Sequence, residues 1–208
     1  MIEYRKMCKK DHNTIKRLVT EAWFDEYDFQ KCVIKNYAKG YLYSYLAESN
    51  FQYVAVEDNK TVGFIFGRVN KVGFWQKLYY NFRLALVGFK LLFFKAGRRG
   101  IKIQSVTNKV NKKLLKQSPV ELRNELVLFI VDSNHRNKGI GTVLEKLFVD
   151  FVKSKGEDKY FLFTDTYSNV GYYESKGYKR ASEAEVDFNV DGEKENPLPY
   201  YYVYYKEV

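Results

Sequence analysis

The stretch ELVLFIVDSNHRNKGIGTVLEKLFVDFVKSKG, residues 125–156, carries the strongest indication of the fold. Residues 125–131 are a continuous apolar run behind one acid, which is typical of a central strand covered on both faces. Residues 142–156 repeat their apolar positions at helical spacing and end at a glycine, which predicts an amphipathic helix. The two elements are joined by R-x-x-G-x-G, from Arg136 to Gly141. Together they predict an α/β layer with a ligand crevice at the end of the strand.

The glycine loop has the composition of an anion site. Gly139 and Gly141 let the backbone approach a ligand closely, and the helix that follows adds unpaired first-turn amides and the positive end of its dipole. Pyrophosphate is the natural occupant, with Arg136 and Lys138 supplying positive charge. The loop is neither a Walker A motif nor the dinucleotide fingerprint, because it lacks G-K-[ST] and a third glycine. A turn that merely connects two elements is the alternative.

The rest of the chain extends this unit into a mixed sheet. We expect strands at 2–7, 51–57, 61–69, 159–165, 178–190 and 199–208, helices near 15–23 and 29–46, and a short helix ending at Gly177. This order predicts a single α/β domain over residues 1–208. Hydrophobic residues make up 46% of the chain, enough for a packed core, which argues against a disordered protein.

The glycine loop and a second motif, YESKGY at 173–178, together resemble the GNAT superfamily of acyl-CoA-dependent N-acetyltransferases. Members carry [QR]-x-x-G-x-[GA] after the fourth strand and Y-E-x-x-G-[FY] at the end of a later helix, and both occur here in that order. The resemblance implies a mixed, mostly antiparallel central sheet flanked by helices, with acetyl-CoA as the acyl donor. It also marks residues 70–122, roughly, as a helical insertion, because members usually have a short connection between the third and fourth strands.

The resemblance implies roles for residues of this chain. Strand backbone would pair with the pantetheine arm of coenzyme A, as an added strand pairs with a sheet edge, and the loop would hold the pyrophosphate. Tyr173 would protonate the departing thiolate, and Glu125, eleven residues before Arg136, would be the general base, with a raised pKa if it faces the apolar interior. The strand residues are Phe129, Ile130 and Val131, and the loop residues are Arg136, Asn137, Lys138, Gly139, Ile140, Gly141 and Thr142.

Each catalytic role has an alternative. Tyr173 could be a core aromatic in a chain with 19 tyrosines, and Glu125 a solvated acid at the start of a strand, with Asp165 as the second candidate base. Many members also place an asparagine about seven residues before the tyrosine, where it contacts coenzyme A. Here Asn169 is only four residues before Tyr173, so it is either a ligand contact or the N-cap of the short helix.

One segment carries the whole positive excess of the chain. From Lys60 to Val120 there are fourteen Lys or Arg residues and no Asp or Glu, whereas the rest has 21 basic against 25 acidic residues. Such a block favours an anionic partner, or else it is a solvated basic face. Within it, residues 74–94 have helical spacing: an apolar arc comprises Trp75, Leu78, Phe82, Leu86, Phe89 and Phe93, and a polar line on another side comprises Gln76, Arg83 and Lys90.

The favoured interpretation of this helix is packing on its own domain. A peripheral contact with an anionic membrane, a lid over the acceptor cleft and the interface of a homodimer are open alternatives. The helix is interrupted too often by Lys and Arg to be a membrane span. A nucleic-acid partner is not favoured, because no nucleic-acid motif is recognisable.

Composition narrows the function classes. The two cysteines, Cys8 and Cys32, have neither metal-ligand nor disulfide spacing, and the N-terminus has no apolar run, so we expect a cytoplasmic protein without a metal site. The leading hypothesis is an N-acetyltransferase in which a primary amine attacks acetyl-CoA directly within a ternary complex. The alternative is a non-catalytic module that binds acyl-CoA or an anionic surface. The acceptor amine, the acyl chain length and the oligomeric state do not follow from the sequence.

Overall fold

The computed structural model describes residues 1–23, 30–168, 170–189 and 197–208. Three expectations fall on other positions. The start of the second helix at Phe29, the role of Asn169 and the end of a strand at Val190 lie outside the described residues.

Among the described residues, seven strands form one sheet with the order β1-β2-β3-β4-β5-β7-β6. Neighbouring strands are antiparallel except β4 and β5, which are parallel. β4 is the central strand, as its apolar run predicts. The expected mixed, mostly antiparallel sheet is confirmed. The strands are β1 Glu3–Lys6, β2 Phe51–Glu57, β3 Lys60–Arg68, β4 Glu125–Val131, β5 Lys159–Asp165, β6 Lys179–Glu185 and β7 Tyr200–Glu207.

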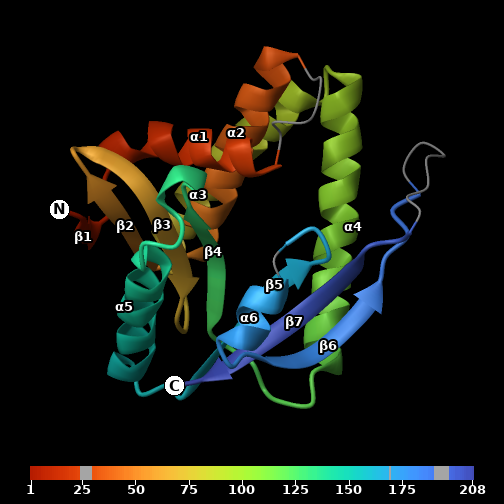
Figure 1. Ribbon diagram of the computed structural model, residues 1–208. Helices are drawn as coiled ribbons and strands as arrows, with labels where there is room; N and C mark the ends of the chain where they lie inside the picture. The colour runs from red at the N-terminus through yellow and green to blue at the C-terminus, as the bar shows by residue number, and fades with distance from the viewer. Residues whose placement is uncertain (24–29, 169, 190–196) are drawn as a thin grey trace.

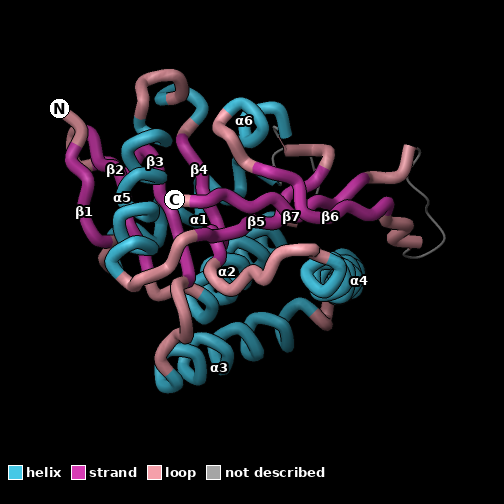
Figure 2. Tube along the Cα trace, turned by 90° about the horizontal axis from the view of Figure 1, so that it is seen from below, coloured by secondary structure: helices cyan, strands magenta, loops and turns pink. Residues whose placement is uncertain are grey.

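Helices cover both faces of the sheet (Figures 1 and 2). α5 packs on one face, where Phe148 is fully buried in the larger core. α1 and α2 pack on the opposite face through residues such as Leu42, and α4 covers β5 and β7 through Leu114. The helices are α1 His12–Trp23, α2 Lys31–Glu48, α3 Phe74–Leu91, α4 Lys95–Gln117, α5 Ile140–Ser154 and α6 Val170–Ser175, with 3-10 turns at Lys9–Asp11 and Ser133–His135.

Two helices, α3 and α4, occupy the segment between β3 and β4, where the apolar spacing indicated only one. α4 escaped recognition because its sequence is rich in Lys and Arg and has two glycines in its first turns. These glycines are what allows it to pack. A Cβ on Gly97 would lie 2.1 Å from the Leu91 carbonyl oxygen, and one on Gly100 would lie 2.0 Å from the Tyr37 hydroxyl. α4 therefore begins in close contact with both α3 and α2, which only glycine permits.

α3 packs on α2 through the side that carries its polar line. The Gln76 amide donates to the carbonyls of Leu46 and Ser49, both at 2.8 Å, and the Arg83 guanidinium donates to the Tyr43 hydroxyl at 2.9 Å. The predicted packing of this helix on its own domain is therefore observed, but it uses the polar line and not the apolar arc. The carbonyls at the C-terminal end of α2 have no partner within that helix, so the polar line of α3 turns inward to satisfy them.

The aromatic arc consequently faces outward, and Figure 2 shows α3 lying beyond α2 at the edge of the molecule. Within the part of the chain that the structure describes, no helix combines the length and apolarity that crossing a membrane requires.

Candidate active site

The loop between β4 and α5 exposes its backbone. Asn137 and Gly139 both have left-handed conformations, with φ of 62° and 77°, so the chain turns sharply on either side of Lys138. A Cβ on Gly139 would meet nothing within 4 Å. Gly139 is also the N-cap of α5 and has no side chain with which to cap it. The first-turn amides and the positive dipole end of α5 are therefore directed at open space, an arrangement that suits a pyrophosphate group.

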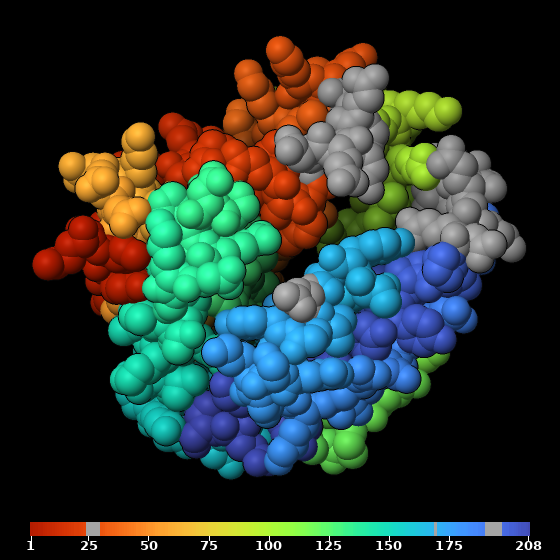
Figure 3. Space-filling view, viewed as in Figure 1, coloured from red at the N-terminus to blue at the C-terminus, as the bar shows by residue number. Residues whose placement is uncertain are grey.

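β4 has a partner strand along its full length on one side only. β3 pairs with it from Glu125 to Val131, whereas β5 is in register at a single position, Glu125↔Phe161. The β5 side of the predicted pantetheine residues Phe129, Ile130 and Val131 thus lacks a recorded strand partner among the described residues. An edge of this kind can pair with an extended, amide-bearing ligand. Figure 3 shows the surface hollowed between the teal-green loop after β4 and the blue segment that carries α6.

Three elements meet at the start of α5. A Cβ on Gly141 would lie 3.0 Å from the Phe129 ring and 3.7 Å from the Tyr172 hydroxyl. Gly141 therefore lets β4 and α6 approach the first turn of α5. Ile140 is fully buried and anchors this turn in the core, whereas Arg136, Asn137 and Lys138 are exposed. The structure thus brings the polar loop residues into one exposed arc, with Thr142 in the first turn of the helix.

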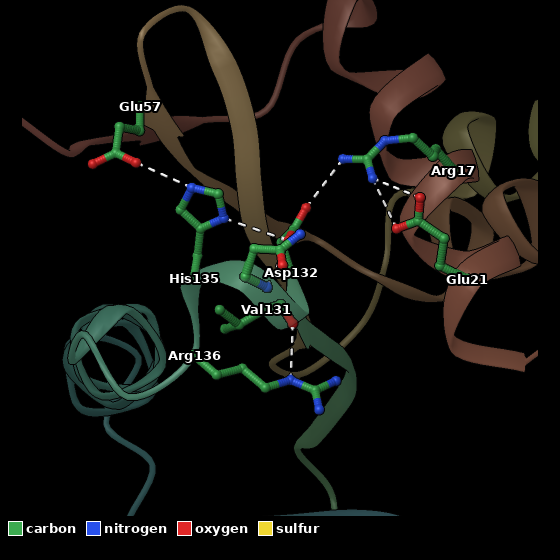
Figure 4. Close-up of polar contacts among 8 residues, drawn as sticks. Arg17, Glu21, Glu57, Val131, Asp132, His135 and Arg136 are labelled. Carbon is green, nitrogen blue, oxygen red and sulfur yellow. Dashed lines mark hydrogen bonds and ion pairs between the residues drawn. The ribbon is translucent and has the colours of Figure 1, made fainter.

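A set of charged contacts holds the loop after β4 (Figure 4). Asp132 accepts a hydrogen bond from the Asn134 amide at 3.0 Å and from Arg17 of α1 at 3.2 Å. Burial would raise the pKa of Asp132, but these hydrogen bonds lower it below its ordinary value, so the carboxylate stays charged. His135 lies between Asp132 and Glu57, with its Nε2 3.1 Å from the Glu57 carboxylate. The loop is thereby tied to α1 and β2.

Arg136, the first residue of the glycine motif, leans back along the strand. Its Nε donates to the Val131 carbonyl at 3.4 Å (Figure 4). This bond directs the guanidinium toward the end of β4, and it occupies one of the backbone acceptors that a ligand on the strand edge would otherwise use. Arg136 is exposed, so its charge remains available to an anion at the loop.

A β-bulge decides where Glu125 points. Leu128 pairs with Phe66 and Leu126 with Gly67, which leaves Val127 as an extra residue in β4. Such an insertion shifts the alternation of the strand by one residue. Leu126 and Phe129 therefore both face α5, and Glu125 faces α2. Simple alternation would have placed Glu125 on the α5 side.

Glu125 is largely buried and forms an ion pair with Arg68 at 2.5 Å. Arg68 also contacts Glu48 of α2 at 2.9 Å, and Glu48 in turn contacts Lys77 of α3 at 2.8 Å. The pKa of Glu125 is raised above its ordinary value by burial, an effect that Arg68 opposes and Glu48 reinforces. A buried carboxyl with a raised pKa is suited to accept a proton near neutral pH.

Tyr173 lies in α6 and packs into the aromatic core on the α5 side. Its ring is 5.4 Å from that of Tyr178 and 6.3 Å from that of Tyr204. Burial raises the pKa of Tyr173 to about 12, so the phenol keeps its proton at neutral pH. Gly177, with φ of 78°, ends the helix, and Tyr178 turns inward to share Glu145 with Tyr160. Part of the YESKGY motif thus serves packing.

Sequence reasoning missed several residues of this region. Arg68 and Asp132 hold Glu125 and the glycine loop, but neither belongs to a motif. The motif singles out Tyr173, but it is the hydroxyl of its neighbour Tyr172 that lies near Gly141. Thr164 in β5 has a buried hydroxyl without a hydrogen-bond partner among the described residues. No local pattern marks any of these positions, because their contacts come from elements far apart in the chain.

Comparison with known proteins gives a family match. Residues 13–178 match the model of the acetyltransferase (GNAT) family. Among curated proteins, nothing matches the chain. Solved structures match over the full chain at low identity, which shows a common fold.

Three of the matching structures are N-acetyltransferases. Drosophila melanogaster polyamine N-acetyltransferase has a TM-score of 0.60 at 10% identity and is itself covered over 100% of its length. The Escherichia coli ribosomal-protein-S18-alanine N-acetyltransferase has a TM-score of 0.54 at 13% identity, and 94% of its length is covered. The PaiA N-acetyltransferase of Thermoplasma acidophilum, solved with coenzyme A, has a TM-score of 0.53 at 16% identity, and 99% of its length is covered. Each match covers 100% of the present chain.

The family match spans most of the chain and includes both motifs, and the sheet is mixed and mostly antiparallel, as the resemblance implied. The chain belongs to the GNAT acetyltransferase family and is an acyltransferase.

Proposed function

We propose that this protein transfers an acetyl group from acetyl-CoA to a primary amine by direct attack within a ternary complex. The observation that carries the proposal is the uncapped start of α5 at Gly139 beside the open edge of β4. Together they offer a phosphate site and a strand edge on the same side of one loop. Coenzyme A has a pyrophosphate followed by an extended arm with two amides, and the family uses acetyl-CoA.

The loop residues Arg136 to Thr142 would hold the pyrophosphate, with Arg136 and Lys138 supplying charge. Backbone groups of Phe129, Ile130 and Val131 would pair with the pantetheine arm. The arm would then run along β4 toward Glu125, which lies about 20 Å from Val131 at 3.3 Å per residue. The reacting thioester would therefore lie between the loop and the buried carboxyl.

The reaction requires two proton transfers. The amine nitrogen attacks the thioester carbon, a C–N bond forms, and the C–S bond breaks. Glu125, directly or through a water molecule, takes the proton that the amine loses. Tyr173, whose raised pKa keeps the phenol protonated, gives a proton to the leaving thiolate. The acceptor itself is left open, since the matching structures include a polyamine N-acetyltransferase and a ribosomal-protein-S18-alanine N-acetyltransferase.

Gly139→Glu tests the phosphate site. We expect the affinity for coenzyme A to fall by at least tenfold, about 1.4 kcal/mol, because a negative charge enters the anion cradle. Gly156→Glu is a matched control: it has a φ of 74°, equally open surroundings, and a position just past the other end of α5. Calorimetry on both folded variants measures the effect. Unchanged affinity in Gly139→Glu, or an equal loss in Gly156→Glu, would mean that the loop only connects two elements.

Arg68→Gln tests Glu125 as the base. A base works when deprotonated, so kcat/KM should fall as pH falls through the pKa of Glu125, which lies above its ordinary value. Removing the Arg68 charge removes the effect that opposes this rise. The acid limb of the profile should therefore move to higher pH, and Glu125→Gln should abolish it with a loss of roughly 10²-fold in kcat.

The control for this experiment is Arg123→Gln, which removes an exposed guanidinium paired with Glu121. Its pH profile should match that of the wild type. An acid limb that stays in place in Arg68→Gln would exclude Glu125 as the titrating base and direct attention to Asp165.

A further inference from the structure

The outer face of α3 is covered by exposed apolar side chains. Trp75 is 77% exposed, Phe82 is 63% exposed and Phe89 is 62% exposed. Between Phe74 and Phe93, nine large apolar side chains are exposed; they are Phe74, Trp75, Leu78, Tyr79, Phe82, Leu86, Phe89, Leu92 and Phe93. We call this set the aromatic face.

The aromatic face is continuous. At 3.6 residues per turn, its members fall within an arc of roughly 140° on the helix. The opposite side of α3 is occupied by α2, against which Val87 and Leu91 are buried. Half-exposed aromatic and leucine side chains at this density form an apolar patch on the order of several hundred Å² or more. Patches of that size on a folded protein mark an interaction surface.

Cations border the aromatic face and no acid interrupts it. Lys77 flanks the arc on one side, and Lys90 and Arg83 flank it on the other. The Arg83 guanidinium lies 4.9 Å from the centre of the Tyr43 ring and donates to the Tyr79 hydroxyl at 2.8 Å, so its position is well determined. Between residues 60 and 120 there is no Asp or Glu at all.

A groove along one border of the face gathers these charges. It has a volume of about 340 Å³ and runs between α2 and α3. Lys39, Arg83 and Lys90 line it, together with Tyr43 and Tyr79. Three cations and two phenols beside an apolar face are the groups that bind phosphate oxygens at the boundary between water and lipid.

We propose that α3 binds the surface of an anionic lipid membrane, with the aromatic face in the interfacial region and the bordering cations on the lipid phosphates. An amphipathic helix with aromatic residues on one side and Lys or Arg beside them binds in this way, parallel to the surface. The positive charge along the borders of the aromatic face favours an anionic partner over a second copy of this chain. A second copy of the chain would bring the same basic borders together, so a dimer through this face would be opposed by repulsion.

Trp75 provides a direct probe of membrane binding. The chain has two tryptophans, and Trp23→Phe leaves Trp75 as the sole tryptophan, which can be excited selectively. With vesicles of phosphatidylcholine containing about one third phosphatidylglycerol, we expect a blue shift of the emission and quenching by brominated lipid. Sedimentation with these vesicles should recover at least tenfold more protein than with phosphatidylcholine alone, and about 0.5 M salt should reduce binding strongly.

Two triple variants of the full-length chain separate the aromatic and electrostatic contributions. Trp75→Ser, Phe82→Ser and Phe89→Ser together should lower vesicle binding at least tenfold, and because all three side chains are exposed the fold should persist. Lys90 borders the aromatic face, and Lys71 and Lys95 lie just before and just after it in the chain. Replacing these three lysines with serine should lower vesicle binding by roughly 10- to 100-fold. The matched control is Lys112→Ser, Lys113→Ser and Lys116→Ser, which removes the same charge about 26 Å along α4 from Lys95 and should bind nearly as well as the wild type.

Three results would overturn the proposal. One is equal sedimentation with anionic and neutral vesicles, or with neither. Another is an equal loss in the two lysine variants, which would mean diffuse attraction without a docking face. The third is a concentration-dependent doubling of mass that the serine substitutions at Trp75, Phe82 and Phe89 abolish, which would assign the face to a second copy. Acetyl transfer in solution is read separately, so none of these outcomes bears on the proposed reaction.

Discussion

Tyr173→Phe is expected to lower kcat for acetyl transfer by roughly 10²-fold, within the usual range for a general acid. Burial raises the pKa of Tyr173 to about 12, so at neutral pH the phenol carries the proton that the proposed mechanism gives to the departing thiolate. Phenylalanine keeps the ring that packs against Tyr178 and Tyr204, so stability should change little. Affinity for acetyl-CoA should also persist, because the proposed phosphate site is at the start of α5. Steady-state kinetics and calorimetry on the purified variant measure the two effects.

Tyr172→Phe is the matched control, since the two tyrosines are neighbours on α6. Tyr172 has its hydroxyl near Gly141, so the structure makes it the rival acid. We expect its removal to change kcat by less than about threefold. Wild-type turnover in Tyr173→Phe would assign Tyr173 to core packing. A large loss confined to Tyr172→Phe would make Tyr172 the acid.

Asp11→Asn is expected to lower the free energy of unfolding by about 3 kcal/mol, the lower end of the range for a broken buried ion pair. Asp11 is 3% exposed and accepts two hydrogen bonds from Arg5 of β1, both at 2.8 Å. It also accepts one from the Cys8 amide at 2.8 Å and one from the Thr61 hydroxyl of β3 at 3.0 Å. This carboxylate thereby links β1, β3 and the start of α1. Asparagine would leave the Arg5 charge without its counterion. Chemical denaturation monitored by circular dichroism gives the free energy.

The effect should depend on pH in a defined direction. Burial alone would raise the pKa of Asp11, but the hydrogen bonds from Arg5, Cys8 and Thr61 lower it well below its ordinary value. Its contribution is therefore present above the unfolded pKa of about 3.9 and is lost as the pH falls below it. The difference between wild type and Asp11→Asn should shrink below about pH 4. Asp150→Asn, which breaks an exposed pair with Lys146, should cost less than 1 kcal/mol, and an equal cost would contradict the assignment.

The sequence by itself determined the elements whose signals are local. The apolar run of β4 and the strands β2 and β5 lie where their composition predicts them. The glycine loop leads into α5, as R-x-x-G-x-G indicates, because a left-handed residue at Gly139 is a local requirement of that turn. Strand composition and helical spacing act over a few residues, so they can be read without the fold. The family followed from the order of two such motifs.

The tertiary structure decided which side chains face which partners. One extra residue at Val127 moves Glu125 from the α5 side of the sheet to the α2 side, where Arg68 pairs with it. Similarly, the Gln76 amide donates hydrogen bonds to carbonyls at the end of α2 that have no partner within that helix. These bonds turn the aromatic face of α3 outward. Spacing shows that a helix has two different sides, but not which side the neighbouring element will satisfy. That choice depends on polar groups contributed by distant parts of the chain, and they meet only when it folds.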